Sequence, residues 1–382
     1  MGFHEFSSPY DWSRIAAYKR TAKAAFGGMI DLSVGSPVDP VPDSVRKALA
    51  VAANDPNAYG YPATAGTADL RAAIAEWFSA ARNVDLQAIH ADVVPTVGSK
   101  EGVALMASLL HCDEGDVVVQ PKVSYPTYEI GTQLAGAQVL KVDDVADVAS
   151  WRNVPGVKAV WVNSPCNPTG EVYSAERMAG IVAAAREIGA VVLSDECYAL
   201  MQWRGAVNGA EGDSLASTPC ALCDDVCLGS AEGVLVLYSL SKQSNMAGYR
   251  TAFIAGDESL IASMSAYRKQ IGQIIPGPVQ AAMAAGLRDL ESVKVQHARY
   301  RERLGVLVSA LRAYGYCTDM PDGALYVWVR AKSGDCWTDM EQLAKIGIIA
   351  SPGEFYGAPE CLRFSATASD EAITSAAERL AR

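Results

Sequence analysis

Short apolar runs rich in valine alternate with alanine-rich stretches through the middle of this chain of 382 residues. Four such runs lie at residues 117–119, 157–162, 191–193 and 234–237. Residues 175–188 place apolar side chains at positions i, i+3, i+4 and i+7, which predicts an amphipathic helix. Continuous apolar strands separated by helices indicate a parallel sheet that is covered on both faces. We therefore predict an α/β fold whose large domain holds a mostly parallel sheet between two layers of helices.

Polar residues stand at the ends of three of these runs. Asn163 follows the run Val-Trp-Val, Asp195 follows Val-Val-Leu-Ser, and Ser239 follows Val-Leu-Val-Leu-Tyr. In open α/β sheets, ligands bind at the carboxyl ends of the strands. We therefore expect these three side chains to meet at one edge of the sheet and to mark a functional site.

The pattern changes after about residue 275. A Pro-Gly-Pro sequence interrupts the chain at residues 276–278, and a single long charged helix is predicted from residue 279 to about residue 314. Short strands are predicted at residues 324–329 and 361–365, which indicates a smaller α+β domain. We divide the chain into an N-terminal arm that is part of the small domain (residues 1–35), a large domain (residues 36–275) and a C-terminal small domain (residues 276–382).

The first thirty residues are typical of an arm and not of a targeting signal. They lack the basic start and the apolar run of a secretory signal. Tyr10 and Trp12 lie in this segment. We expect the arm to pack elsewhere, with a partner subunit as one candidate.

Composition excludes several classes of function. The net charge of −11 argues against binding to nucleic acid or to an anionic membrane surface. No stretch approaches the roughly eighteen apolar residues that a membrane span needs. Nine cysteines without an export signal indicate reduced thiols in the cytoplasm. Cys220, Cys223 and Cys227 have metal-like spacing, but no histidine lies nearby in the sequence, so we predict no metal and interpret them as thiols of a solvent-facing loop.

Lys242 lies in the segment Ser239-Leu240-Ser241-Lys242, and Arg250 follows eight residues later. A lysine can bind an aldehyde cofactor covalently, and two hydroxyls with a guanidinium can hold that cofactor's phosphate. The alternative is a solvated lysine in a serine-rich turn. Other parts of a pyridoxal phosphate site occur elsewhere in the chain, and they favour the cofactor.

Three further residues suit the cofactor ring. Asp195 at its strand end can keep the ring nitrogen protonated, although such an aspartate can also cap the next helix. Tyr198 and Asn167 suit the phenolic oxygen of the ring, while Asn167-Pro168-Thr169-Gly170 can also be an ordinary turn. We predict Lys242, Asp195 and Tyr198 as the catalytic residues.

A phosphate site needs backbone N–H groups at the start of a helix. An apolar strand at residues 93–97 leads into Gly98, Ser99 and Lys100, which open a helix and complete the predicted phosphate cup. Tyr125 is predicted to stack on the cofactor ring; the alternative is a buried aromatic residue of the core.

A substrate carboxylate needs a cation. Arg363 lies between Leu362 and Phe364 in a predicted strand, where it needs an anionic partner. We predict that it binds the substrate carboxylate; an ion pair within the protein is the alternative.

Eight segments together resemble the fold-type I, class I/II aminotransferases. They occur in the order of that family and run through most of the chain: LSVGSPVDPVP, YGYPATAGTADLR, VGSKEG, SYPTYE, NSPCNPTG, SDECY, SLSKQSNMAGYR and CLRFS. The resemblance implies a pyridoxal 5′-phosphate enzyme whose cofactor lies in residues 36–275. It implies Lys242 as the cofactor-bound base, Asp195 on the ring nitrogen, Asn167 and Tyr198 on the phenolic oxygen, Arg250 with Ser239 on the phosphate, and Arg363 on the substrate.

The resemblance also implies a homodimer with shared active sites. Gly35 matches a glycine whose backbone approaches the substrate, and Tyr61 matches a tyrosine that reaches the phosphate of the partner subunit, with Tyr59 as the second choice. Ala252 departs from the family, which usually has glycine there.

Within this family the chain is most similar to the N-succinyldiaminopimelate aminotransferases of actinobacteria. That similarity implies L-glutamate as amino donor to N-succinyl-2-amino-6-oxopimelate, in lysine and diaminopimelate biosynthesis. The alternatives are another class I/II aminotransferase of the aspartate, aromatic or alanine type, and a pyridoxal phosphate C–S lyase. A non-catalytic sensor with the same fold is an alternative of a different class.

Overall fold

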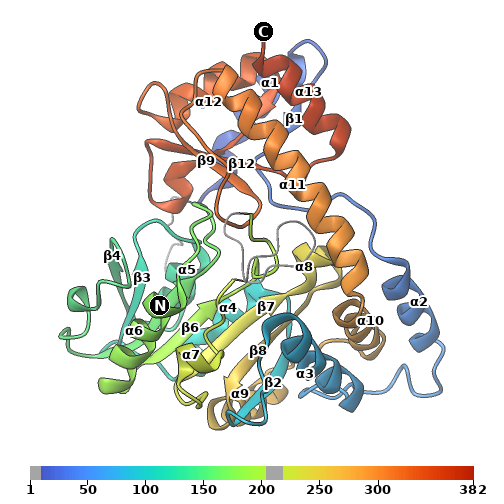
Figure 1. Ribbon diagram of the computed structural model, residues 1–382, viewed down its shortest axis with the longest axis vertical. Helices are drawn as coiled ribbons and strands as arrows, with labels where there is room; N and C mark the ends of the chain where they lie inside the picture. Colours follow the sequence, from blue (N-terminus) through green and yellow to red (C-terminus); the bar gives the residue numbers. More distant parts are fainter. Residues whose placement is uncertain (1–9, 204–217) are drawn as a thin grey trace, which may run out of the picture.

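The computed structural model describes residues 10–203 and 218–382. Within these residues the largest sheet has seven strands in the order β2-β8-β7-β6-β5-β3-β4 (Figure 1). Only β8 runs antiparallel to its neighbours, so the sheet is mixed but mostly parallel, as predicted. The strands are β2 (Ala91–Val97), β3 (Val117–Pro121), β4 (Gln138–Val142), β5 (Val157–Asn163), β6 (Val191–Asp195), β7 (Val234–Ser239) and β8 (Thr251–Asp257).

Helices cover both faces of this sheet because alternate strand residues point to opposite faces. In β5, Val160 and Val162 join one hydrophobic cluster, while Ala159 and Trp161 join another. The first cluster includes residues of α3 (Ala68–Arg82), α6 (Ala175–Glu187), α7 (Asp224–Cys227) and α10 (Gly277–Arg288). The second includes residues of α4 (Ser99–Leu109), α5 (Thr127–Leu134) and α9 (Glu258–Gln270). The helix predicted at residues 175–188 is α6.

A second unit lies beyond the carboxyl edge of the sheet, at the top of Figure 1. It holds the three-stranded sheet β11-β12-β9 and the short parallel pair β1-β10 around a separate hydrophobic cluster. Its strands are β1 (Ile30–Asp31), β9 (Tyr326–Arg330), β10 (Ile348–Ile349), β11 (Ser351–Pro352) and β12 (Cys361–Ser365). Its helices are α1 (Ala16–Ala24), α12 (Cys336–Lys345) and α13 (Asp370–Leu380), joined by the far half of α11 (Leu290–Ala313).

The prediction of a single long helix from residue 279 is wrong, because α10 and α11 are separate helices. Asp289 leaves the helical conformation (φ −88°, ψ 66°), and its carboxylate accepts a hydrogen bond from the backbone N of Ser292 at 3.0 Å. It thereby caps α11. α10 packs against α2 (Asp43–Ala52) and α3.

The two cores meet along α11. Val293 near its start belongs to the cluster of the large sheet, whereas Tyr300 and Leu304 belong to the cluster of the second unit. The domain division at residue 276 stays a prediction; the core of the large sheet extends past it, through α10.

The cysteine group at residues 220–227 lies differently from its predicted position. Cys220 and Cys227 are fully buried and Cys223 is partly buried, so the prediction that these thiols lie in a solvent-facing loop is wrong. α7 packs against α6 and carries Cys227 into the core, and Cys220 belongs to the same buried cluster. In the described part of the chain no cluster of His, Cys, Asp or Glu could hold a metal ion. Among the same residues no helix is long and apolar enough to cross a membrane.

Candidate active site

A cavity of about 380 Å³ lies where the carboxyl edge of the sheet faces the second unit. Its position agrees with the rule that such sheets bind ligands at this edge. Twelve of the predicted site residues line it: Gly35, Ser99, Lys100, Tyr125, Asn167, Asp195, Tyr198, Ser239, Ser241, Lys242, Arg250 and Arg363. The strand-end prediction is confirmed for Asp195 and Ser239, and Asn163 pairs with Asp195 in the adjacent strand.

Lys242 enters the cavity from α8 (Leu240–Gln243), a short helix directly after β7. Ser239 caps α8, because its Oγ accepts a hydrogen bond from the backbone N of Ser241 at 3.1 Å. The Lys242 Nζ donates to the carbonyl oxygen of Gly35. Burial lowers the pKa of Lys242, and the cations Arg363 and Arg250 lower it further. The amine is therefore closer to its neutral, nucleophilic form than that of an exposed lysine.

Asp195 is the last residue of β6 and is only 6% exposed. Its Oδ2 accepts a hydrogen bond from the Tyr128 hydroxyl at 2.7 Å, and its Oδ1 accepts one from the backbone N of Cys197 at 3.2 Å. These hydrogen bonds lower the pKa of Asp195, but burial outweighs them and raises it above its ordinary value. Within the described residues it has no ion pair and caps no helix. The cavity therefore presents an anionic group that a ligand cation can neutralise.

Arg250 lines the cavity beside the start of α4, where its Nη2 lies 3.5 Å from the carbonyl oxygen of Val97. Gly98 precedes this helix with φ 78° and no side-chain cap. A Cβ at Gly98 would meet the guanidinium of Arg250, and the positive φ is a conformation that favours glycine. The first backbone N–H groups of a helix have no partner within it. Together with Ser99 and Ser241 they form a cup for an anion.

Arg363 lies in β12 and is buried. Its Nη1 donates to Asn167 Oδ1 at 2.7 Å, and its Nη2 donates to the carbonyl oxygen of Ser33 at 2.8 Å. Its Nε has no hydrogen-bond partner, and no carboxylate pairs with it among the described residues. The rings of Tyr326 and Tyr356 lie 4.0 and 4.7 Å from its Cζ. The ion pair within the protein is therefore not found, and the guanidinium stays available for an anion.

The chain matches the sequence model of the family aminotransferase class I and II over residues 27–380. It belongs to this family. Aminotransferases of this family depend on pyridoxal 5′-phosphate, and the fold is the class I aminotransferase fold.

Relatives and solved structures agree with this membership. The 4-dedimethylamino-4-oxo-anhydrotetracycline transaminase OxyQ of Streptomyces rimosus is 39% identical, over 97% of this chain and 98% of that protein. An LL-diaminopimelate aminotransferase of Syntrophobacter fumaroxidans is 29% identical, over 97% and 95%. The structure of a probable N-succinyldiaminopimelate aminotransferase from Thermus thermophilus is 27% identical, with a TM-score of 0.83 over 97% of this chain and 99% of that chain.

The cavity of this aminotransferase also contains residues that the sequence did not predict: Tyr10, Trp12, Val34, Cys197, Ala247, Tyr326 and Tyr356. The described part of the arm packs on its own chain, where the rings of Tyr10 and Trp12 lie 5.6 and 5.2 Å from that of Phe355. The Tyr326 hydroxyl lies 2.6 Å from that of Tyr198. No local signal marks these residues, because strand alternation does not tell which face borders a cavity.

The aromatic residues have mixed outcomes. Tyr125 lines the cavity and also packs edge to face on Tyr128, with 5.7 Å between ring centroids. The interpretation of Tyr125 as a core aromatic residue therefore holds in part, and its stacking on the cofactor ring stays a prediction. Tyr61 and Tyr59 are exposed, and neither lines the cavity.

Proposed function

We propose that this aminotransferase uses Lys242 to hold the aldehyde of its cofactor and to carry the substrate proton. One observation supports this most strongly. Three groups share one cavity: a lysine with a lowered pKa, a buried aspartate and a buried arginine, and in the described part of the chain the aspartate pairs with no cation and the arginine with no carboxylate. These groups are complementary to an aldehyde, a protonated ring nitrogen and a substrate carboxylate, respectively.

Each part of the cofactor has a complementary group. Asp195 would hold the ring nitrogen, Tyr198 and the amide nitrogen of Asn167 the phenolic oxygen, and Tyr125 a ring face. The phosphate would lie in the cup, which is formed by Gly98, Ser99, Lys100, Ser239, Ser241 and Arg250.

The protein's own groups then move one proton. When bound, the cofactor supplies an electron-withdrawing ring that stabilises negative charge at the substrate α-carbon. Asp195 would keep the ring nitrogen protonated, because among the described residues its carboxylate is in no ion pair that would compete for it. The Lys242 amine takes the α-proton and later returns it, and its lowered pKa favours the neutral form that this step needs. Arg363 fixes the α-carboxylate through its unpaired Nε and so orients the α-carbon.

A variant pair tests this role of Lys242. The Lys242→Ala protein should lose at least about 10³-fold in the rate of amino transfer from L-glutamate, because it lacks the base and the cofactor attachment. Lys345→Ala removes an exposed lysine of α12 and should stay within about twofold of the unchanged protein. A Lys242→Ala protein that transfers amino groups at full rate would contradict the proposal.

For the acceptor we propose N-succinyl-2-amino-6-oxopimelate, the oxo form of N-succinyl-LL-2,6-diaminopimelate, in lysine biosynthesis in the cytoplasm. The Thermus and Syntrophobacter relatives support a diaminopimelate-type substrate. The 39% identity to OxyQ favours a second candidate, an oxo-anhydrotetracycline. The values of kcat/KM for amino transfer from L-glutamate to N-succinyl-2-amino-6-oxopimelate, to the oxo form of LL-diaminopimelate and to 4-dedimethylamino-4-oxo-anhydrotetracycline decide between them. The proposal requires the succinylated compound to exceed both others at least tenfold.

Elimination is the main rival reaction, since a C–S lyase needs the same lysine and aspartate. Incubation with a cysteine conjugate and no oxo acid separates the two. Release of pyruvate and ammonia would identify a lyase. A non-catalytic sensor would bind the cofactor and show neither reaction.

We also propose a homodimer in which Tyr61 completes the phosphate cup of the partner subunit. Its exposure in the single chain supports this role. If Tyr61→Phe weakens cofactor binding, its subunits can be mixed with Lys242→Ala subunits. In each mixed dimer the site that keeps Lys242 receives an intact Tyr61 from its partner, so amino-transfer activity should return at one site per dimer. Absence of restored activity in verified mixed dimers would rule out a shared site.

A further inference from the structure

The residues from Leu32 to Pro40, here called the crossing segment, pass through the active site without forming a helix or strand. The carbonyl oxygen of Gly35 accepts a hydrogen bond from Lys242 Nζ, and that of Ser33 accepts one from Arg363 Nη2 at 2.8 Å. One end of the segment therefore orients both the lysine and the arginine of the site. Backbone hydrogen bonds to Ile349 and Ser365 hold the segment at Leu32. Beyond Leu32, the hydrogen bonds that the structure gives to the segment come from side chains.

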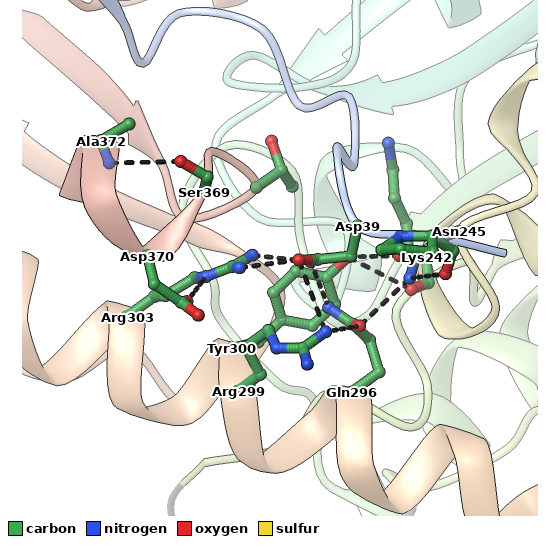
Figure 2. Close-up of polar contacts among 12 residues, drawn as sticks. Asp39, Lys242, Asn245, Gln296, Arg299, Tyr300, Arg303, Ser369, Asp370 and Ala372 are labelled. Carbon is green, nitrogen blue, oxygen red and sulfur yellow. Dashed lines mark hydrogen bonds and ion pairs between the residues drawn. The ribbon is translucent and has the colours of Figure 1, made fainter. Parts of the chain in front are cut away.

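Asp39 holds the other end of the crossing segment against α11. Its two carboxylate oxygens accept hydrogen bonds from Arg303 Nη1 and Nη2 at 2.7 and 2.8 Å, and Gln296 Nε2 donates to it at 2.8 Å. Figure 2 shows Asp39 between these α11 side chains and the stretch of chain that holds Lys242 and Asn245. The side chains of Asp39 and Arg303 are 10% and 3% exposed. Two parallel hydrogen bonds at such low exposure fix both distance and orientation.

Asn245 lies in the loop directly after α8, the helix that carries Lys242, and ties the same end of the crossing segment to this loop, here called the lysine loop. Its Nδ2 donates to the carbonyl oxygen of Pro40 at 3.2 Å and to Gln296 Oε1 at 3.1 Å. The Tyr300 hydroxyl donates to Asn245 Oδ1 at 3.1 Å and lies 3.5 Å from the carbonyl oxygen of Lys242. Asp39, α11 and the lysine loop therefore form one polar network (Figure 2).

We propose that Asp39 is a positioning residue for the amino-transfer reaction. It clamps the crossing segment to α11 and thereby places the Gly35 and Ser33 carbonyl oxygens against Lys242 and Arg363. The inference rests on the proposed roles of Lys242 and Arg363. A buried charge pair is strongly weakened when one partner loses its charge. Asp39 lies four residues after Gly35, so neutralising it should free the crossing segment near Gly35.

Asp370 offers a matched control on the same guanidinium. Arg303 Nε donates to Asp370 Oδ1 at 2.6 Å, and the Asp370 side chain is 63% exposed. Asp370→Asn therefore weakens one contact of Arg303 without touching the crossing segment. An effect that comes only from loosening Arg303 would appear in both variants. An effect of the clamp would appear in Asp39→Asn alone.

The experiment compares steady-state kinetics with L-glutamate, cofactor affinity and amide hydrogen exchange in cofactor-loaded protein. For Asp39→Asn we expect kcat/KM to fall at least tenfold, with KM raised at least fivefold. Exchange should be at least tenfold faster for amides of residues 33–38. Cofactor affinity should stay within twofold, since no residue of the phosphate cup contacts Asp39. Asp370→Asn should stay within twofold in every readout.

Two further variants test the same clamp if the Asp39→Asn protein does not fold. Arg303→Lys keeps the charge but loses the two-pronged geometry, and Asn245→Gly removes the amide at a position with φ 55°, which glycine tolerates. Both should change kcat/KM and exchange in the same direction as Asp39→Asn.

Several outcomes overturn the proposal. Equal kinetics in Asp39→Asn and Asp370→Asn would exclude the clamp, and so would slower turnover with unchanged exchange. A lowered melting temperature with unchanged kcat/KM would reduce Asp39 to a structural role. If the unchanged protein fails to transaminate L-glutamate, the proposed function fails instead, and the exchange comparison still decides whether Asp39 holds the segment.

Discussion

Lys242 donates a hydrogen bond from its Nζ to the carbonyl oxygen of Gly35, which lies 207 residues earlier in the chain. This contact joins the end of a central strand of the large sheet to a segment that also contacts the second unit. Ser33, two residues before Gly35, binds Arg363 in β12 through its carbonyl oxygen. The lysine and the arginine of the site are therefore connected through two backbone carbonyl groups of one short segment.

The substrate role of Arg363 predicts a specific kinetic change. Arg363→Lys should raise KM for L-glutamate about 100-fold, because a lysine cannot keep the bonds to Asn167 and Ser33 and also bind a carboxylate with two N–H groups. That loss corresponds to about 2.7 kcal/mol of charge-assisted hydrogen bonding. Arg330→Lys, at an exposed position at the end of the neighbouring strand β9, should leave KM within twofold. Equal KM values in both variants would assign the carboxylate to another residue.

Asp195 predicts that the cofactor-free protein loses stability as pH rises. Burial raises its pKa above the ordinary value of 3.8, so the folded state binds the proton more tightly than the unfolded state does. The stability from the protonated group is present below pH 3.8 and is lost as pH rises through the folded pKa. Cofactor-free Asp195→Asn should therefore unfold at higher urea concentration than the unchanged protein at pH 7, and at a similar concentration below pH 3.8. A less stable variant at pH 7 would show that the carboxylate has a cation partner.

Asp39 predicts the opposite dependence on pH. Burial alone would raise its pKa, but the hydrogen bonds from Arg303 and Gln296 lower it below 3.8. Its stabilising contribution is then complete above pH 3.8 and is lost as pH falls through the lowered pKa. Asp39→Asn should reduce the free energy of unfolding by about 2 kcal/mol at pH 7, and the difference in stability between the two proteins should become smaller in acid. Urea unfolding curves between pH 7 and pH 3 measure this difference. A difference that grows in acid would contradict the charge pair.

A buried ion pair beside the site predicts a large loss of stability. Arg82 Nη2 lies 2.6 Å from Glu196 Oε2, and both side chains are buried. Glu196→Gln should reduce the free energy of unfolding by about 3 kcal/mol or more, because it leaves the Arg82 charge uncompensated. The matched surface pair is Arg152 with Glu187. Glu187→Gln should cost less than about 1 kcal/mol, and equal losses in the two variants would show that the Arg82 charge has another partner.

The sequence predicted the parts of the structure that follow from local rules. Continuous apolar runs, each ended by a polar residue, placed Asp195 and Ser239 at the same edge, because parallel strands end together. The break at Asp289 was missed since an aspartate is compatible with a helix as well as with its cap. Burial of Cys220 was missed because spacing between cysteines does not tell which side of a loop faces the core.

Long-range contacts of irregular segments are beyond such rules. Asp39 stands between Val38 and Pro40 in a stretch without periodicity, and its partner Arg303 comes from a helix 264 residues later. Tyr10 and Tyr326 reach the cavity only because the arm and the second unit fold over the sheet edge. The family resemblance supplied the predicted role of Gly35; the contacts of Asp39 became visible only in the folded structure.

The most direct test of the account is the absorption spectrum of the purified, cofactor-loaded protein before and after L-glutamate is added. The account predicts a yellow band from the cofactor held by Lys242, which L-glutamate converts to the absorption of the amino form and an oxo acid restores. A band that L-glutamate leaves unchanged would contradict amino transfer from this donor. Absence of any band with excess cofactor would contradict the assignment of Lys242, Asp195 and the phosphate cup together.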